Sequence, residues 1–209
     1  MNGVGAAWVF TRSGGVWSQQ AKLVGTDSVG FARQGWSVSL SSDGNTAILG
    51  GWGDSHNPAL GGISGTGAAW VFTRSGGVWS QQGSKLVGTG AVGSDNPAQG
   101  LSVSLSADGN TAIIGGHQDN KDVGAAWVFT RSGAIWSQQA KLVGTGAIGP
   151  AGQGSSLALS GDGSTAIVGG PGDNGNTGAR WVFTLSGGVW SQQDLNLSVP
   201  AFYLPARDY

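Results

Sequence analysis

The chain has 209 residues, a formal net charge of −1 at pH 7, 41 glycines and no cysteine. Without cysteine there is no disulfide, thiolate metal site or thiol nucleophile. A near-neutral charge with no basic run disfavours nucleic acid and anionic membranes as partners. No apolar stretch is long enough to predict a membrane-spanning helix, and the N-terminal MNGVGAAWVF lacks the charged and apolar regions of a secretory signal peptide.

The acidic residues are all aspartate, and glutamate is absent. Aspartate and glycine favour turns, whereas glutamate is the better helix former. The composition therefore predicts a turn-rich chain built from strands.

Residues 5–24 begin the chain with two predicted strands joined by a glycine turn. The string that forms them returns three times, at spacings of 62, 57 and 54 residues between the first tryptophans of successive copies. Self-similarity at such a period indicates a repeat architecture. The copies are GAAWVFTRSGGVWSQQ at 5–20 and 67–82, GAAWVFTRSGAIWSQQ at 124–139, and GARWVFTLSGGVWSQQ at 178–193.

A second recurrent segment precedes each of the last three copies. In 101–106, LSVSLS, apolar residues alternate with serines, which predicts a half-buried strand. Asp108, Gly109 and Asn110 then predict a tight hairpin, and TAIIGG at 111–116 is the return strand. The three copies are QGWSVSLSSDGNTAILGG at 34–51, QGLSVSLSADGNTAIIGG at 99–116 and QGSSLALSGDGSTAIVGG at 153–170.

Each full unit thus contains four predicted strands, of which the third, GAAWVFTRS, is apolar on both faces and the fourth, IWSQQAKLVG, is the most polar. Four short strands per unit, with the middle ones buried on both sides, are typical of a β-propeller with four-stranded antiparallel blades. The polar fourth strand is expected at the outer edge. Within 1–193 we expect a half-blade at 5–24 and three blades at about 34–87, 99–143 and 153–194.

Together, the QG-x-S strand, the DGNTAI turn, the GGxxDN loop, GAAWVFT and WSQQAKL resemble the bacterial FG-GAP repeat, which is related to the integrin α-chain propeller. The resemblance covers residues 3–193. It implies a propeller ring and a cell-surface or secreted location. The FG of the family name is replaced here by QG, at Gln34, Gln99 and Gln153.

The resemblance does not extend to calcium. Integrin-type repeats carry several alternating aspartates between the first two strands, whereas each unit here has one, at Asp43, Asp108 and Asp162. One carboxylate cannot supply the six to eight oxygens that calcium takes. We therefore expect no metal and no other cofactor.

Residues 194–209, DLNLSVPAFYLPARDY, leave the repeat pattern. This tail is a candidate for closing the first half-blade, either within one chain or between two copies, since LNLSV is similar to the first-strand pattern. Alternatively it is unrelated and the chain is a fragment. An open arc would expose apolar blade faces, which favours a homo-oligomer, although Pro200 and Pro205 argue against a long regular strand.

Tryptophan, which stacks well on sugar rings, occurs ten times. Eight of the ten occupy repeat positions, where packing between blades is the simpler interpretation. Trp36 and Trp52 are different, because the other units have Leu101 and Ser155, and His117 and Pro171, in their places. We therefore expect Trp36 and Trp52 to be accessible, and they are candidate ligand-binding residues.

The loop after the second strand of each unit varies in length but retains one aspartate, at Asp54, Asp119 and Asp173. Loops on one face of a propeller often carry binding residues, so these aspartates are candidates for hydrogen bonds to glycan hydroxyl groups or a protein. The alternative is an aspartate that caps its own turn. His56 and His117 lie in two such loops, with too few further ligands for a metal site.

No constellation of catalytic residues is visible. The aspartates are spread by the repeat rather than paired in one cleft, and no serine has a nucleophile-elbow context. We expect a non-enzymatic binding or adhesion module that presents its loops to an extracellular ligand, with a glycan as the first candidate. The alternative is a structural self-assembly element without a small ligand.

Overall fold

The computed structural model describes residues 3–56, 65–93 and 96–193. They form three four-stranded antiparallel sheets and one two-stranded sheet, which confirms an all-β fold of four-stranded blades. The two-stranded sheet consists of β1 (Ala7–Ser13) and β2 (Val16–Leu23). The expected C-terminal tail lies outside the described residues.

Each four-stranded sheet contains strands that are consecutive in the chain, and each fourth strand forms an outer edge, as the sequence predicts. The first sheet contains β3 (Ser37–Leu40), β4 (Thr46–Gly51), β5 (Ala68–Ser75) and β6 (Val78–Gln81). The second contains β7 (Ser102–Leu105), β8 (Thr111–Gly116), β9 (Ala125–Ser132) and β10 (Ile135–Leu142). The third contains β11 (Ser156–Leu159), β12 (Thr165–Gly170), β13 (Ala179–Ser186) and β14 (Val189–Gln193).

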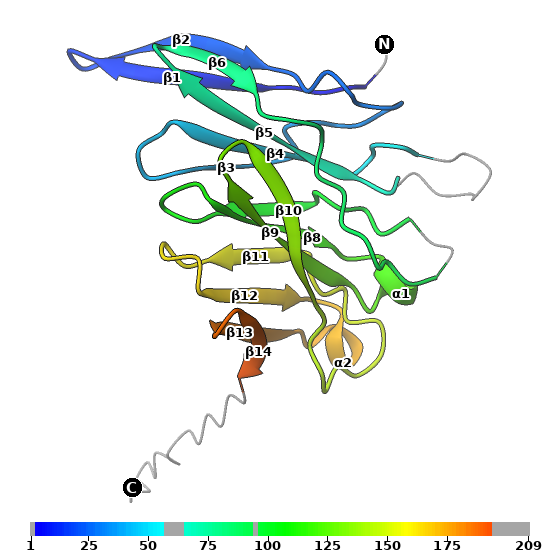
Figure 1. Cartoon of the computed structure of the whole chain (residues 1–209). Helices are drawn as coiled ribbons and strands as arrows, with labels where there is room; N and C mark the ends of the chain where they lie inside the picture. The colour runs from blue at the N-terminus through cyan, green and yellow to red at the C-terminus, as the bar shows by residue number, and fades with distance from the viewer. Residues whose placement is uncertain (1–2, 57–64, 94–95, 194–209) are drawn as a thin grey trace, which may run out of the picture.

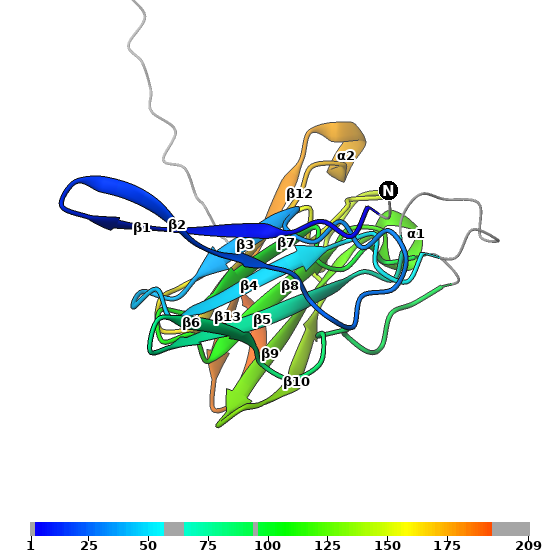
Figure 2. The same ribbon diagram turned by 90° about the horizontal axis from the view of Figure 1, so that it is seen from above.

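The sheets follow one another in chain order, from the blue β1–β2 pair to the orange β13–β14 pair (Figure 1). The first strand of the middle sheet, β7, contacts the first strands of both neighbouring sheets, β3 and β11. The sheets do not close into a ring within the described residues. One side of the arc carries α1 (Asp119–Asp122) and α2 (Asp173–Asn176), together with the N-terminal end (Figures 1 and 2). Neither of these two short helices is long enough to span a membrane.

Each blade packs through its tryptophan-bearing face onto the blade before it. Trp127 and Phe129 lie in one cluster with Val103 and Leu105 of their own blade and Ile48 of the preceding blade. The fit requires glycine, because a Cβ at Gly88 would lie 2.2 Å from the Trp127 ring. The other two boundaries are built in the same way.

The glutamine that replaces phenylalanine in the QG motif is buried in all three blades. The Gln99 side-chain oxygen accepts a hydrogen bond from the Gly88 amide at 2.5 Å, and its Nε2 donates to the Gly88 carbonyl at 2.9 Å. Gln34 and Gln153 hold Gly25 and Gly144 in the same way. A buried glutamine with both ends of its amide paired is stable in an apolar boundary, so this residue fixes the glycine that the next tryptophan packs against.

Candidate functional site

The three loop aspartates are buried, and their carboxylates accept hydrogen bonds from other residues of the chain. Asp54, Asp119 and Asp173 each accept a hydrogen bond at 2.7 Å from a backbone amide in the connection that leads into the blade, donated by Val29, Val92 and Ile148. The donors lie 25 to 27 residues earlier in the chain. Each aspartate therefore links the loop after the second strand of its blade to the connection that precedes the blade. Neither of the two roles predicted from the sequence, ligand binding or capping of its own turn, includes this link.

Two of these carboxylates also form ion pairs. Lys85 lies 2.5 Å from Asp54, and Lys141 lies 2.6 Å from Asp119. A buried charge needs such compensation, because water no longer solvates it. Asp173 has no counterpart lysine, since its unit reads WSQQDLN where the others read WSQQAKL or WSQQGSKL. The loop aspartates thus have a structural role, and their burial leaves little carboxylate surface for an external ligand.

Trp52 is also buried, with 8% of its surface exposed, so the prediction that it is accessible is wrong. It is covered by Arg33, whose guanidinium lies 4.1 Å from the centre of the Trp52 ring. Arg33 is replaced by Ala98 and Gly152 in the other blades. The Trp52 Nε1 donor has no hydrogen-bond partner among the described residues.

Trp36, by contrast, is 57% exposed. Its ring meets Trp52 edge to face, with 5.5 Å between the centroids, which is a favoured aromatic arrangement. Trp36 also donates its backbone amide to the Arg33 carbonyl at 3.2 Å. The structure therefore brings the two candidate tryptophans together, with one as the accessible ring and the other as its support.

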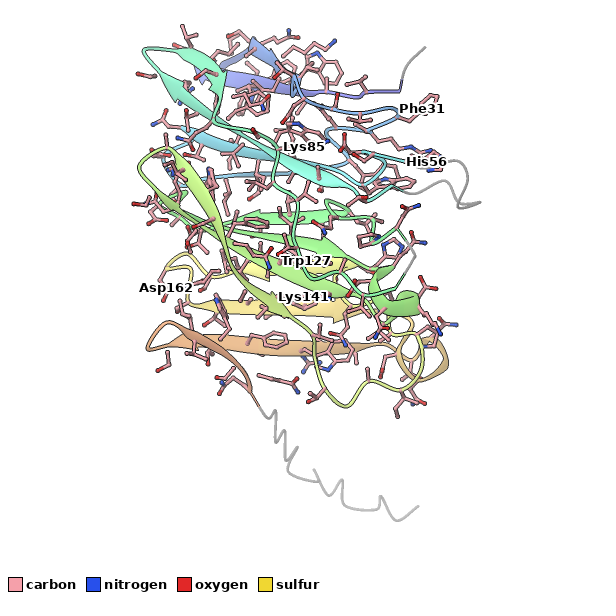
Figure 3. The ribbon with its side chains drawn as sticks, turned by 45° about the vertical axis from the view of Figure 1, so that its right-hand side comes forward. Phe31, His56, Lys85, Trp127, Lys141 and Asp162 are labelled. Atoms are coloured by element: carbon pink, nitrogen blue, oxygen red, sulfur yellow. The ribbon has the colours of Figure 1, made fainter. Side chains whose placement is uncertain are left out.

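Phe31 and Arg33 are the residues that the sequence reasoning missed. Phe31 is exposed and borders an open hollow of about 380 Å³ shared with Val4, Ser28 and Gly30. Figure 3 places Phe31 on the same side of the molecule as His56. We call Phe31, Arg33, Trp36 and Trp52 the aromatic cluster.

Arg33 occupies a strained backbone position, with φ of 58°. The equivalent residues, Ala98 and Gly152, have φ of 56° and 64°, so the turn itself requires a left-handed residue. Glycine is the least costly choice there, and a non-glycine residue in this region stores strain of about 1 kcal/mol or more. At Arg33 this strain is offset by the stacking of the guanidinium on the Trp52 ring, which is worth about 0.5–2 kcal/mol. An alignment of FARQG with NPAQG and PAGQG would have identified both missed residues.

The hairpin aspartates have unusually acidic side chains. The Ser41 hydroxyl and the Asn45 amide donate to Asp43, and these bonds lower the pKa of Asp43 to about 2. The Ser160 hydroxyl and the Ser164 amide lower the pKa of Asp162 to about 2 in the same way. These carboxylates thus stabilise their own turns. Within the residues that the structure describes, no cluster of three or more His or Asp is placed to hold a metal ion.

His117 occupies the position of Trp52 in the second blade. Burial lowers the pKa of His117, and the charge of Asp122 opposes this effect. Its Nδ1 also has no hydrogen-bond partner among the described residues. The position after the GG motif therefore holds an unsatisfied polar atom in two of the three blades.

Comparison with known proteins supports the fold. The FG-GAP repeat family model matches residues 17–72, which confirms the resemblance stated above. A protein from Bacteroides uniformis ATCC 8492, provisionally described as a 6-phosphogluconolactonase, matches with a TM-score of 0.60 and 12% identity over 91% of this chain and 48% of its own. A protein from Lactobacillus plantarum matches with a TM-score of 0.56 and 16% identity over 89% and 47%.

This chain therefore spans about half the length of these solved structures. At such identities the likeness shows the propeller-like fold alone. A search of curated proteins gave no match. Taken together, the repeat and the fold are those of a repeat-based binding or scaffold module.

Proposed function

We propose that this FG-GAP repeat protein is a non-enzymatic binding module that recognises a glycan through the aromatic cluster of its first whole blade. The observation that carries the proposal is the exposed Trp36 ring, which the repeat does not require, because Leu101 and Ser155 occupy its position in the other blades. A large exposed aromatic side chain that packing does not explain is a candidate contact residue.

The cluster has the parts that a pyranose ring needs. An exposed indole face can stack on the apolar C–H face of a sugar, and Trp52 fixes the orientation of Trp36. The guanidinium of Arg33 carries several N–H donors that suit ring hydroxyl groups.

The experiment is a glycan array, probed with calcium and with a chelator, followed by titration of the best hit. We expect binding that is insensitive to the chelator. Trp36→Ala should weaken it at least tenfold, which corresponds to about 1.4 kcal/mol. The matched control is Trp17→Ala, because Trp17 is also exposed but lies on β2, outside the cluster. A blank array, or equal losses in both variants, would contradict the proposal.

The second candidate is a self-assembling scaffold. It is favoured by Trp8 and Phe10 of the half-blade, which are exposed, whereas their equivalents Trp70 and Phe72 are buried against the preceding blade. At the other end, however, the third blade carries exposed Arg180 where the first two blades bury Ala69 and Ala126. Simple head-to-tail packing would bury that charge, and a buried unpaired charge is costly.

This candidate ranks second for that reason, and its test is the mass in solution. If the chain assembles through its end blades, sedimentation should give a mass above that of one chain, and Trp8→Ser should lower it. A single-chain mass at high protein concentration would exclude the scaffold candidate.

A further inference from the structure

The Arg33 guanidinium has neither a hydrogen-bond acceptor nor a carboxylate partner among the described residues, and its contact there is the Trp52 ring. Asp54, two positions after Trp52, is paired with Lys85 and has none of its surface exposed. Arg33 itself is only partly exposed, so water solvates its charge incompletely. An anion bound at this point would supply the partner that the described chain leaves out.

Two other arginines stack on tryptophan in this fold, and both have acceptors. Arg74 lies over Trp79 and Arg131 lies over Trp136, each with 5.4 Å between the guanidinium carbon and the ring centre. Each guanidinium donates to an asparagine of its own blade and to a glutamine of the preceding one, at 2.9–3.0 Å. The acceptors are Asn45 and Gln20 for Arg74, and Asn110 and Gln82 for Arg131. Stacking on tryptophan therefore accounts for the position of Arg33 but not for its free donors.

The turn that contains Arg33 does not require an arginine. Ala98 and Gly152 form the same left-handed turn in the other two blades, with φ of 56° and 64°. Arg33 adopts φ of 58°, a conformation that is strained for a residue with a side chain. A large charged residue at a strained position where a small one is sufficient is better explained by binding than by folding.

Stacking also leaves the useful part of the guanidinium free. It occupies the flat face of the group, whereas the N–H donors lie in the plane and form a fixed fork that matches the two oxygens of a carboxylate. The exposed Trp36 ring contacts the same Trp52 ring, with 5.5 Å between the centroids. An apolar stacking surface and an anion-binding fork therefore share one supporting side chain.

We infer that the aromatic cluster selects an acidic glycan, with Trp36 stacked on a pyranose ring and the Arg33 guanidinium bound to the carboxylate of a uronic acid. The inference rests on the proposed function and names the ligand class of that site. A uronic acid carries its carboxylate directly on the pyranose ring, so one or two adjacent sugars reach both groups. Aspartate and glutamate of a peptide also fit the fork, but their side chains offer no apolar ring face to Trp36.

The test uses the full chain and oligosaccharides of galacturonic, glucuronic and mannuronic acid. Each is compared with the same oligosaccharide after its carboxyl groups are reduced to hydroxymethyl groups. Titration calorimetry at one fixed ionic strength measures both affinities, because salt screens the charge contact. We expect at least one acidic form to bind about tenfold or more tightly than its reduced form, as hydrogen bonds to a charged group allow.

Arg33→Ala is the decisive variant, because Ala98 shows that alanine fits this turn. It should weaken the acidic form about tenfold or more and leave the reduced form nearly unchanged. Arg33→Lys keeps the charge without the fork, so it should recover only part of the affinity. Trp36→Ala should weaken both forms alike. Arg131→Ala is the matched control, since it removes a stacked arginine outside the cluster, and it should alter neither affinity.

The two proposals fail in different ways. If no oligosaccharide binds in either form, the glycan site itself is contradicted and the inference falls with it. If the acidic and reduced forms bind equally, the glycan site stands and only the inference is overturned. Equal losses of both forms in Arg33→Ala and Arg33→Lys would also overturn it, because the arginine would then only support Trp52. Tighter binding of an aspartate-rich peptide, abolished by Arg33→Ala, would assign the fork to a protein partner instead and overturn it as well.

Discussion

The second blade and the half-blade contain nearly the same third and fourth strands, yet the same side chains have different environments in the two. Trp127 has none of its surface exposed, whereas Trp8 has 54% exposed. The difference does not come from the strands themselves, since both are antiparallel pairs that carry one register shift at the same place in the repeat. It comes from the neighbours, because Trp127 packs on Gly88 of the blade before it and Trp8 has no such neighbour among the described residues.

In this fold, burial is therefore a property of position along the arc as much as of the repeat sequence. A repeat architecture predicts this behaviour, since each unit is stabilised mainly by its interfaces with adjacent units. Substitutions at equivalent positions should consequently change the free energy of unfolding by very different amounts. A residue in one blade can therefore serve as the control for its equivalent in another.

The largest difference is expected at the marker tryptophans. Trp127→Ala should lower the free energy of unfolding by about 3–5 kcal/mol, because it leaves a cavity between two blades. Trp8→Ala should change it by less than about 1 kcal/mol, as is usual for an exposed side chain. Urea denaturation followed by circular dichroism measures both. Equal losses would mean that Trp8 is buried in solution.

The next difference concerns the lysines of the fourth strand. Lys141→Met removes the partner of buried Asp119 and should cost about 1–3 kcal/mol, below the full value for a buried pair because Lys141 is partly exposed. Lys22 holds the same repeat position but is exposed, beside the Trp8 ring. Lys22→Met should be within about 0.5 kcal/mol of wild type. A similar cost for both would show that the ion pair does not stabilise the second blade.

The smallest effect is expected in the hairpin turns, which are alike in all three blades. The pKa of Asp43 and of Asp162 is about 2 in the folded chain, below the value of about 3.9 for an unfolded chain. Each carboxylate thus contributes stability that is complete above about pH 4 and is lost as the pH falls towards 2. Unfolding midpoints measured between pH 2 and 5 should fall with acidity, and Asp162→Asn should flatten that dependence. A midpoint that rises on acidification would contradict the assignment.

The strands and the hairpin turns could be predicted from the sequence, because period-2 patterning and Asp-Gly turns are local signals. The role of the loop aspartates could not. The partners of Asp54 and Asp119 lie in earlier connections, at Val29 and Val92, and pairing over such a separation leaves no local pattern. The burial of Trp52 depends on Arg33, a residue from another loop.

Two of the four residues of the aromatic cluster could be predicted from the sequence. Trp36 and Trp52 were identified because they break the repeat, and the same comparison applied to the FARQG segment would have added Phe31 and Arg33. Departures from a repeat are therefore the most informative residues of such a chain, since packing already accounts for the positions that recur.

The most direct test of this account is hydroxyl-radical footprinting of the intact chain, with the modification of each tryptophan followed by mass spectrometry. The account predicts strong labelling of Trp8 and Trp36, protection of Trp70 and Trp127, and loss of the Trp36 label alone when a bound glycan is added. Protection of Trp8 and Trp36 in the free chain, to the level of Trp70, would contradict it.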